Sequence, residues 1–145
     1  MVTNWRDTTA EHVQSDLDRL LNRVLPFADE MLVRHGEFYP YGAAITMDGK
    51  EQLFAADPGE TVDPSPAEVL NSIIDGISDE VSGLRAAALV TDVTNSRGDA
   101  IMVHLEHADQ LAIAVLLPYA RRKEIEYGDL VATPAAARIW RPSLC

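Results

Sequence analysis

The segment from His104 to His107 holds two histidines and a glutamate within four residues. Zinc deaminases use a His-x-Glu pair, in which the glutamate moves protons, but they need a following Pro-Cys-x-x-Cys for the other zinc ligands. The chain has a single cysteine, Cys145, and it also has no His-Glu-x-x-His motif of the kind zincins carry on a helix. The sequence therefore predicts no metal site and no cofactor, and it favours hydrogen-bonded or surface roles for the histidines.

Motifs for nucleophilic catalysis and for phosphate binding are missing as well. There is no Gly-x-Ser-x-Gly, no Gly-x-x-x-x-Gly-Lys-Ser/Thr and no Gly-x-Gly-x-x-Gly. These absences favour a protein that is not an enzyme. The alternative is an enzyme or small-ligand binder, whose pocket we expect near polar residues that include a possible Glu37–Arg85 ion pair. The residues of this expected pocket are Glu37, Tyr39, Arg85, His104 and Glu106.

Acidic residues outnumber basic ones by 23 to 12, which gives a net charge of −11. Nucleic acids and anionic membranes repel such a surface. Residues 48–80 carry nine acids and one base, or −8 of that total. This segment is either a solvated face or a docking surface for a basic protein, since complementary charge speeds association. The candidate binding residues are Glu60, Asp63, Glu68, Asp75 and Asp79.

Three of the nine aromatic residues lie between Phe38 and Tyr41. One interpretation is that these residues fill the core at the start of the first strand. The other is that Tyr39 and Tyr41 contribute to an interface, such as that of a homodimer. The only basic run, Arg121–Lys123, is either a solvated loop or a contact for an anion or for the acidic helix of a second copy.

The single cysteine cannot form an intramolecular disulfide, which favours the cytoplasm. The N-terminal residues are polar and predict no secretory signal. The longest apolar run, Leu111–Leu117, is too short to span a bilayer.

The first element we expect is a helix, because apolar residues recur every three or four positions from Val13 to Leu32. Thr8 and Glu11 have the spacing of a capping box, and Gly36 is a plausible C-cap. Pro26 lies inside the pattern and predicts a kink or a split into two helices.

A hairpin follows, with strands at Tyr41–Met47 and Glu51–Ala56 joined at Asp48-Gly49. The second helix starts at Ser65 as the cap and Pro66 as its first residue, and it ends by Gly83.

Three strands then form a meander at residues 84–94, 100–107 and 111–117. Alternation in the second of them puts His104 and Glu106 on one face and His107 on the other. The third is nearly all apolar, which predicts a central position. A short strand at 124–127 is possible, and residues 128–145 are left unassigned. The sequence thus predicts a single α+β domain over residues 1–145, in the order α-β-β-α-β-β-β, with one antiparallel sheet of about five strands.

This order of elements resembles the roadblock and profilin-like folds, in which the first and last strands lie side by side in a 2-1-5-4-3 sheet. The stretch from His35 to Ala43, HGEFYPYGA, together with Leu105-Glu106-His107 and Leu117-Pro118-Tyr119, resembles a family of small uncharacterised bacterial proteins. The resemblance covers about residues 10–132 and implies no activity and no catalytic residues.

We therefore expect an acidic cytoplasmic domain that binds a basic protein through residues 57–80, for example as an immunity protein that neutralises a cationic toxin. No nucleic-acid or membrane partner is expected.

Overall fold

The computed structural model describes residues 9–55, 65–96, 98–121 and 123–140, which form two α-helices and a seven-stranded antiparallel sheet. This confirms the α+β class with a single antiparallel sheet. The elements in chain order are α1 (Glu11–His35), β1 (Tyr41–Thr46), β2 (Glu51–Ala55), α2 (Pro66–Asp79), a 3-10 turn (Val81–Gly83), β3 (Leu84–Asn95), β4 (Gly98–His107), β5 (Leu111–Arg121), β6 (Ile125–Tyr127) and β7 (Val131–Pro134). The sheet has two strands more than expected: the short β6 was foreseen only as a possibility, and β7 comes from the unassigned tail.

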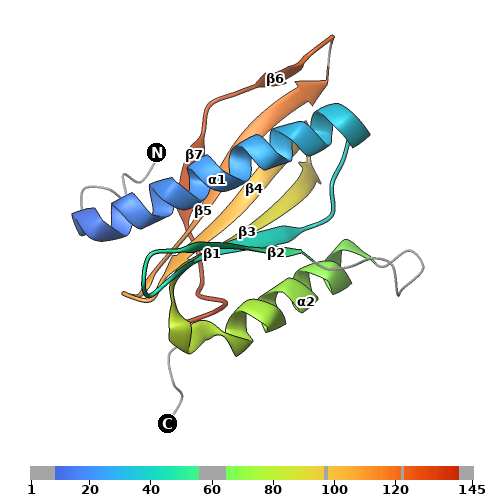
Figure 1. Ribbon diagram of the computed structural model, residues 1–145. Coiled ribbons are helices and arrows are strands. Elements are labelled where there is room, and N and C mark those ends of the chain that lie inside the picture. Colours follow the sequence, from blue (N-terminus) through green and yellow to red (C-terminus); the bar gives the residue numbers. More distant parts are fainter. Residues whose placement is uncertain (1–8, 56–64, 97, 122, 141–145) are drawn as a thin grey trace.

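The strands are arranged in the order β2-β1-β3-β4-β5-β6, and β7 also pairs with β5 (Figure 1). The predicted 2-1-5-4-3 order is therefore wrong, since β1 pairs directly with β3 through partners such as Gly42 and Leu89. Short turns connect β3, β4 and β5, and they keep these sequence neighbours adjacent in the sheet. The apolar β5 is still internal, because β4 flanks it on one side and β6 and β7 flank it on the other.

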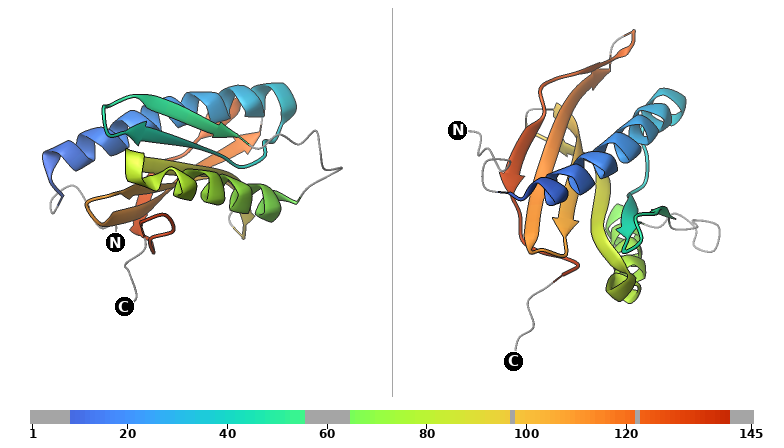
Figure 2. Two further views of the ribbon diagram at one scale, coloured as in Figure 1. Left: turned by 60° about the horizontal axis from the view of Figure 1, so that its bottom comes forward. Right: turned by 60° about the vertical axis from the view of Figure 1, so that its left-hand side comes forward.

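The two helices lie on opposite faces of the sheet (Figures 1 and 2). The larger core lies under α1 and includes Leu17, Val24, Val103 and Leu105. The smaller core lies under α2, which packs on the β1–β3 part of the sheet. Each helix therefore buries one apolar face and leaves the opposite face to solvent.

α1 is one continuous helix that runs through Pro26. Of the two predicted outcomes, a kink or a split, the split does not occur, because Leu20, Val24 and Ala28 on both sides of the proline are all fully buried in one core under the helix. The helix begins at Glu11 after Ala10, which makes no side-chain cap, and Thr8 lies outside the described residues. Gly36 does form the C-cap, with a φ of 77° and its N–H donated to the Leu32 carbonyl.

α2 starts as the sequence predicts. The Ser65 hydroxyl accepts the backbone N–H of Glu68 at 3.1 Å, and Pro66 occupies the first turn, where no N–H is needed. Val69, Ile73 and Ile77 form its buried face. In the described part of the chain, neither helix is long and apolar enough to cross a membrane.

Candidate functional site

A buried carboxylate, Asp16, joins α1 to the sheet. The Arg85 guanidinium donates to both of its oxygens, at 3.1 Å from Nε to Oδ2 and 3.0 Å from Nη2 to Oδ1. His107 Nε2 lies 2.9 Å from Oδ2. Burial alone would raise the pKa of Asp16, but the hydrogen bonds from His107 and Arg85 outweigh it and hold the pKa below its usual value. Asp16 is therefore a charged group that is fully engaged inside the fold.

A β-bulge places Arg85 in this cluster. Ile45 pairs with Ala86 and Thr46 pairs with Leu84, so Arg85 is an extra residue between two matched positions. A bulge re-aims the side chain that it carries. The Arg85 side chain therefore points toward α1 and Asp16, and the expected Glu37–Arg85 ion pair is not formed.

The hydrogen bonds of His107 fix its tautomer. Nδ1 accepts the backbone N–H of Asp109 at 3.1 Å, so it carries no proton, and the proton on Nε2 is donated to Asp16. Both ring nitrogens are thus used, and the side chain is 4% exposed. His107 has no free lone pair for a metal ion or for proton transfer, and its role is to tie β4 to α1.

His104 and Glu106 lie together on the opposite face of β4, as alternation predicts. His104 Nε2 is 2.8 Å from Oε1 of Glu106. Burial would raise the pKa of Glu106, but His104 and three backbone N–H groups hydrogen-bond the carboxylate and hold the pKa below its usual value. The three N–H groups belong to Arg138, Ile139 and Trp140.

The carboxylate of Glu106 therefore anchors the segment after β7 to the sheet. Ile139 is buried there, and Trp140 packs against the core under α2. The sequence places Glu106 on the same face of its strand as His104, but it does not show that the partners are backbone groups more than thirty residues further along the chain.

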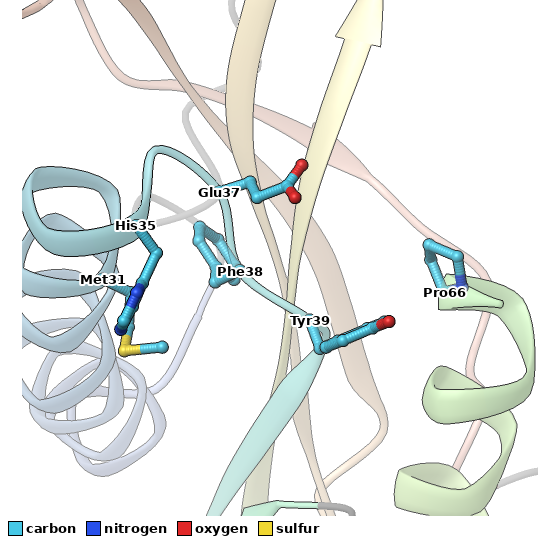
Figure 3. A pocket seen from close by; sticks show the side chains of 6 residues that line it. All are labelled: Met31, His35, Glu37, Phe38, Tyr39 and Pro66. Carbon is cyan, nitrogen blue, oxygen red and sulfur yellow. The ribbon is translucent and has the colours of Figure 1, made fainter. Parts of the chain in front are cut away.

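Glu37 and Tyr39 line a cavity of about 430 Å³ between the end of α1 and the start of α2. Figure 3 shows Met31 and His35 on α1, and Tyr39 reaching from the connection between α1 and β1 toward Pro66. The cavity is lined by Met31, His35, Glu37, Phe38, Tyr39 and Pro66.

The five residues of the expected pocket do not share one site. Glu37 and Tyr39 line this cavity, while Arg85 binds Asp16 in the cluster on the α1 side of the sheet. His104 and Glu106 are buried and bonded to each other on the α2 side. The prediction of a single pocket is therefore wrong, and only its Glu37 and Tyr39 part corresponds to a cavity.

Tyr41, a candidate interface residue, is 4% exposed. Its hydroxyl donates to the Val24 carbonyl at 2.6 Å, and its ring meets Phe27 and Phe38 edge to face. Tyr41 is thus a core residue, whereas Tyr39 is 44% exposed and remains available to a partner.

A second cavity of about 520 Å³ lies between α1 and the β5–β6 connection. Its rim carries charges of both signs, and Asp29 there accepts a hydrogen bond from the Tyr127 hydroxyl. The lining residues are Asp29, Leu32, Val33, Arg121, Lys123, Glu124 and Ile125.

Three candidate binding acids, Glu68, Asp75 and Asp79, are exposed on α2. Spacings of seven and four residues place them on one side of the helix, along about 17 Å of its length. None of the three side chains forms an ion pair or hydrogen bond with another residue in the described ranges. The two other candidates, Glu60 and Asp63, lie outside the described residues. We call the side formed by Glu68, Asp75 and Asp79 the acidic face of α2.

Within the described residues, no group of three or more His, Cys, Asp or Glu side chains could hold a metal ion. Comparison of the chain with protein-family models, with curated proteins and with solved structures finds no match. The resemblance of the sequence to a family of small bacterial proteins therefore stays a prediction.

Proposed function

We propose that this chain is a cytoplasmic protein-interaction module without catalytic activity, and that it binds a basic partner protein through the acidic face of α2. The observation that carries the proposal is the row of exposed carboxylates at Glu68, Asp75 and Asp79, none of which has a cationic partner among the described residues. An immunity protein that neutralises a cationic toxin is one concrete form of this function.

The position of these acids favours binding over folding. Asp79 is the last residue of α2, where the negative end of the helix dipole disfavours a carboxylate, and the last turn carries no basic residue. The buried side of the helix is already packed on the sheet, so the acidic face contributes little to the core. Acids that cost the helix some stability are expected where they serve an external partner.

The buried polar clusters support the absence of catalysis. Asp16, His107 and Glu106 are each engaged by several hydrogen bonds from other parts of the chain. A general base needs a free lone pair within reach of a substrate. These groups hold elements of the fold together, and none of them lines either of the two cavities described above.

The test compares two variants with equal charge change. One carries Glu68→Gln, Asp75→Asn and Asp79→Asn on α2. The control carries Glu11→Gln, Glu124→Gln and Asp129→Asn, which are exposed acids elsewhere. Each protein is immobilised, incubated with lysate of the source organism, eluted in steps of salt and analysed by mass spectrometry.

We expect a basic protein that is retained by the wild type and by the control, is released by moderate salt, and is lost from the α2 variant. Screening of exposed charges makes such association sensitive to salt. Equal retention by the α2 variant and the control would contradict the proposal, because net charge alone would then explain the binding.

A second copy of the chain is the alternative partner. Arg121 and Lys123 are exposed at the end of β5 and the following turn, and neither forms an ion pair with a described residue. They carry the charge opposite to that of the acidic face. Light scattering at low and high salt distinguishes the cases: a dimer that dissociates in salt and in the α2 variant favours self-association, and a monomer in both favours a different protein.

A further inference from the structure

The cavity lined by Glu37 and Tyr39 adjoins the acidic face of α2. Pro66, which forms one wall, is the first residue of that helix, and Glu68 follows two residues later. A partner that lies along the acidic face therefore reaches the mouth of the cavity. Cavities of about this volume commonly hold a small molecule or an anchoring side chain.

The lining has an apolar part and a polar part. Met31, Phe38 and Pro66 supply apolar walls, His35 supplies an imidazole, and Glu37 supplies the only carboxylate among the described lining residues. Among the described residues, no lysine or arginine lines the cavity, and Glu37 forms no ion pair or hydrogen bond with any of them. A ligand that complements this cavity is therefore expected to carry a positive charge.

An anion fits less well, although a helix N-terminus lies at the wall. The Ser65 hydroxyl already accepts the Glu68 N–H, so one of the donors that an anion would use is occupied. Glu37 and Glu68 would both repel a negative ligand. The attraction of the positive end of the α2 dipole for an anion is thus offset by the repulsion from these two carboxylates.

An exposed aromatic ring beside the carboxylate selects the kind of cation. Figure 3 shows Tyr39 extending across the space between the α1–β1 connection and α2. A guanidinium group stacks on an aromatic ring and pairs with a carboxylate through two parallel hydrogen bonds, whereas an ammonium group does neither in the same way. Tyr39 and Glu37 together therefore fit arginine better than lysine.

We propose that this cavity is an arginine-binding site, in which Glu37 pairs with the guanidinium and Tyr39 stacks on it. The arginine belongs to the basic partner protein, and in this respect the inference rests on the proposed function. The acidic face of α2 attracts the partner over a distance, and the cavity holds one side chain in place.

The test uses short peptides and needs no partner protein. Acetyl-Gly-Arg-Gly-amide is titrated into the isotope-labelled full chain, and amide chemical shifts are followed by NMR. The matched peptide carries citrulline, which keeps the shape of arginine and loses its charge. We expect saturable shifts at residues 35–39 with the arginine peptide, and binding about tenfold or more weaker with citrulline.

Variants then separate the two contacts. Glu37→Gln is expected to weaken arginine binding about tenfold or more. Tyr39→Phe is expected to retain the binding and Tyr39→Ala to weaken it, because the ring and not the hydroxyl makes the contact. Glu124→Gln, at the other cavity, is the control and is expected to bind as the wild type does. Equal binding of the citrulline peptide, equal binding by Glu37→Gln, or shifts confined to other residues would each overturn the inference.

The two proposals can fail separately. If the peptide binds at residues 35–39 but the α2 variant retains its lysate proteins like the control, the proposed function fails and the arginine site stands. If the α2 variant loses its partner but the peptide does not bind, the arginine site fails alone.

Discussion

Nε2 of His107 lies 2.9 Å from Oδ2 of Asp16, and this hydrogen bond joins the end of β4 to the second turn of α1. Asp16 stands beside Leu17 in the buried stripe of the helix, at a position where a purely apolar contact would suit the core equally well. A polar contact with fixed geometry specifies one position of the helix along the sheet. Apolar packing alone specifies this position less strictly.

Replacement of Asp16 by Ala is expected to destabilise the fold by about 2–4 kcal/mol. It leaves His107 and the partly buried Arg85 without their shared acceptor. Urea unfolding measures the loss. Glu11→Gln, an exposed change on the same helix, is expected to stay within about 0.5 kcal/mol of the wild type. A loss for Asp16→Ala no larger than that of the control would show that the cluster does not hold the helix.

Stability is expected to fall as the solution is acidified below about pH 5. The pKa values of Asp16 and Glu106 in the folded chain lie below their ordinary values of 3.8 and 4.5, so the unfolded chain binds more protons. The stabilisation from these two carboxylates is therefore complete above the unfolded values and is lost as the pH drops through the folded ones. Urea unfolding between pH 3 and pH 7 checks this.

In this pH series, Glu106→Gln is expected to be less stable than the wild type at pH 7 and to lose less stability as the pH is lowered. The amide at position 106 does not titrate, so only Asp16 of the two carboxylates still contributes to the loss of stability in acid. Parallel curves for the two proteins would contradict the assignment of the acid sensitivity to Glu106.

The sequence predicted the elements well because their signals are local. The Ser65 and Pro66 start of α2, the Gly36 end of α1 and the alternation of His104 and His107 all depend on residues within a few positions. The register shift beside Arg85 is different, because it belongs to the pairing of β3 with β1, which are distant in the sequence, and no local pattern marks it.

Long-range pairing explains the remaining errors. The order of the sheet depends on β1 pairing with β3, and the resemblance to other folds suggested a different neighbour. Strand β7 was missed because it is only four residues long, ends in a proline and depends on β5 for its pairing. The cavity at Glu37 needs the start of α2 as its second wall, and the sequence does not show that Pro66 lies there.

Loss of the Glu106 carboxylate is expected to release the segment after β7. In Glu106→Gln, the amide groups of Arg138, Ile139 and Trp140 lose an acceptor that carries a negative charge. Their hydrogen exchange should become about tenfold to a hundredfold faster than in the wild type. Glu124→Gln is the control, since this exposed residue lies by the other cavity. Unchanged exchange at these three amides would mean that packing of Ile139 alone holds the segment.

Gly42 sets how closely α2 approaches the sheet, and with it the position of the acidic face. A Cβ atom at Gly42 would lie 2.9 Å from Cγ2 of Ile73 and 3.0 Å from the Ala88 carbonyl oxygen. Gly42→Ala must therefore push the helix outward, and we expect it to destabilise the fold by about 1–3 kcal/mol.

Gly83→Ala is the matched control, because no described residue other than its chain neighbours lies within 4 Å of a Cβ atom at Gly83. It is expected to stay within about 0.5 kcal/mol of the wild type in urea unfolding. Binding of the basic partner distinguishes an effect of helix position from an effect of stability. Under conditions where both variants are folded, only Gly42→Ala should weaken this binding. The reason is that its displaced helix changes the distance between Glu68 and the cavity at Tyr39. Equal stability of the two variants would show that the contact between α2 and β1 is looser than this geometry requires.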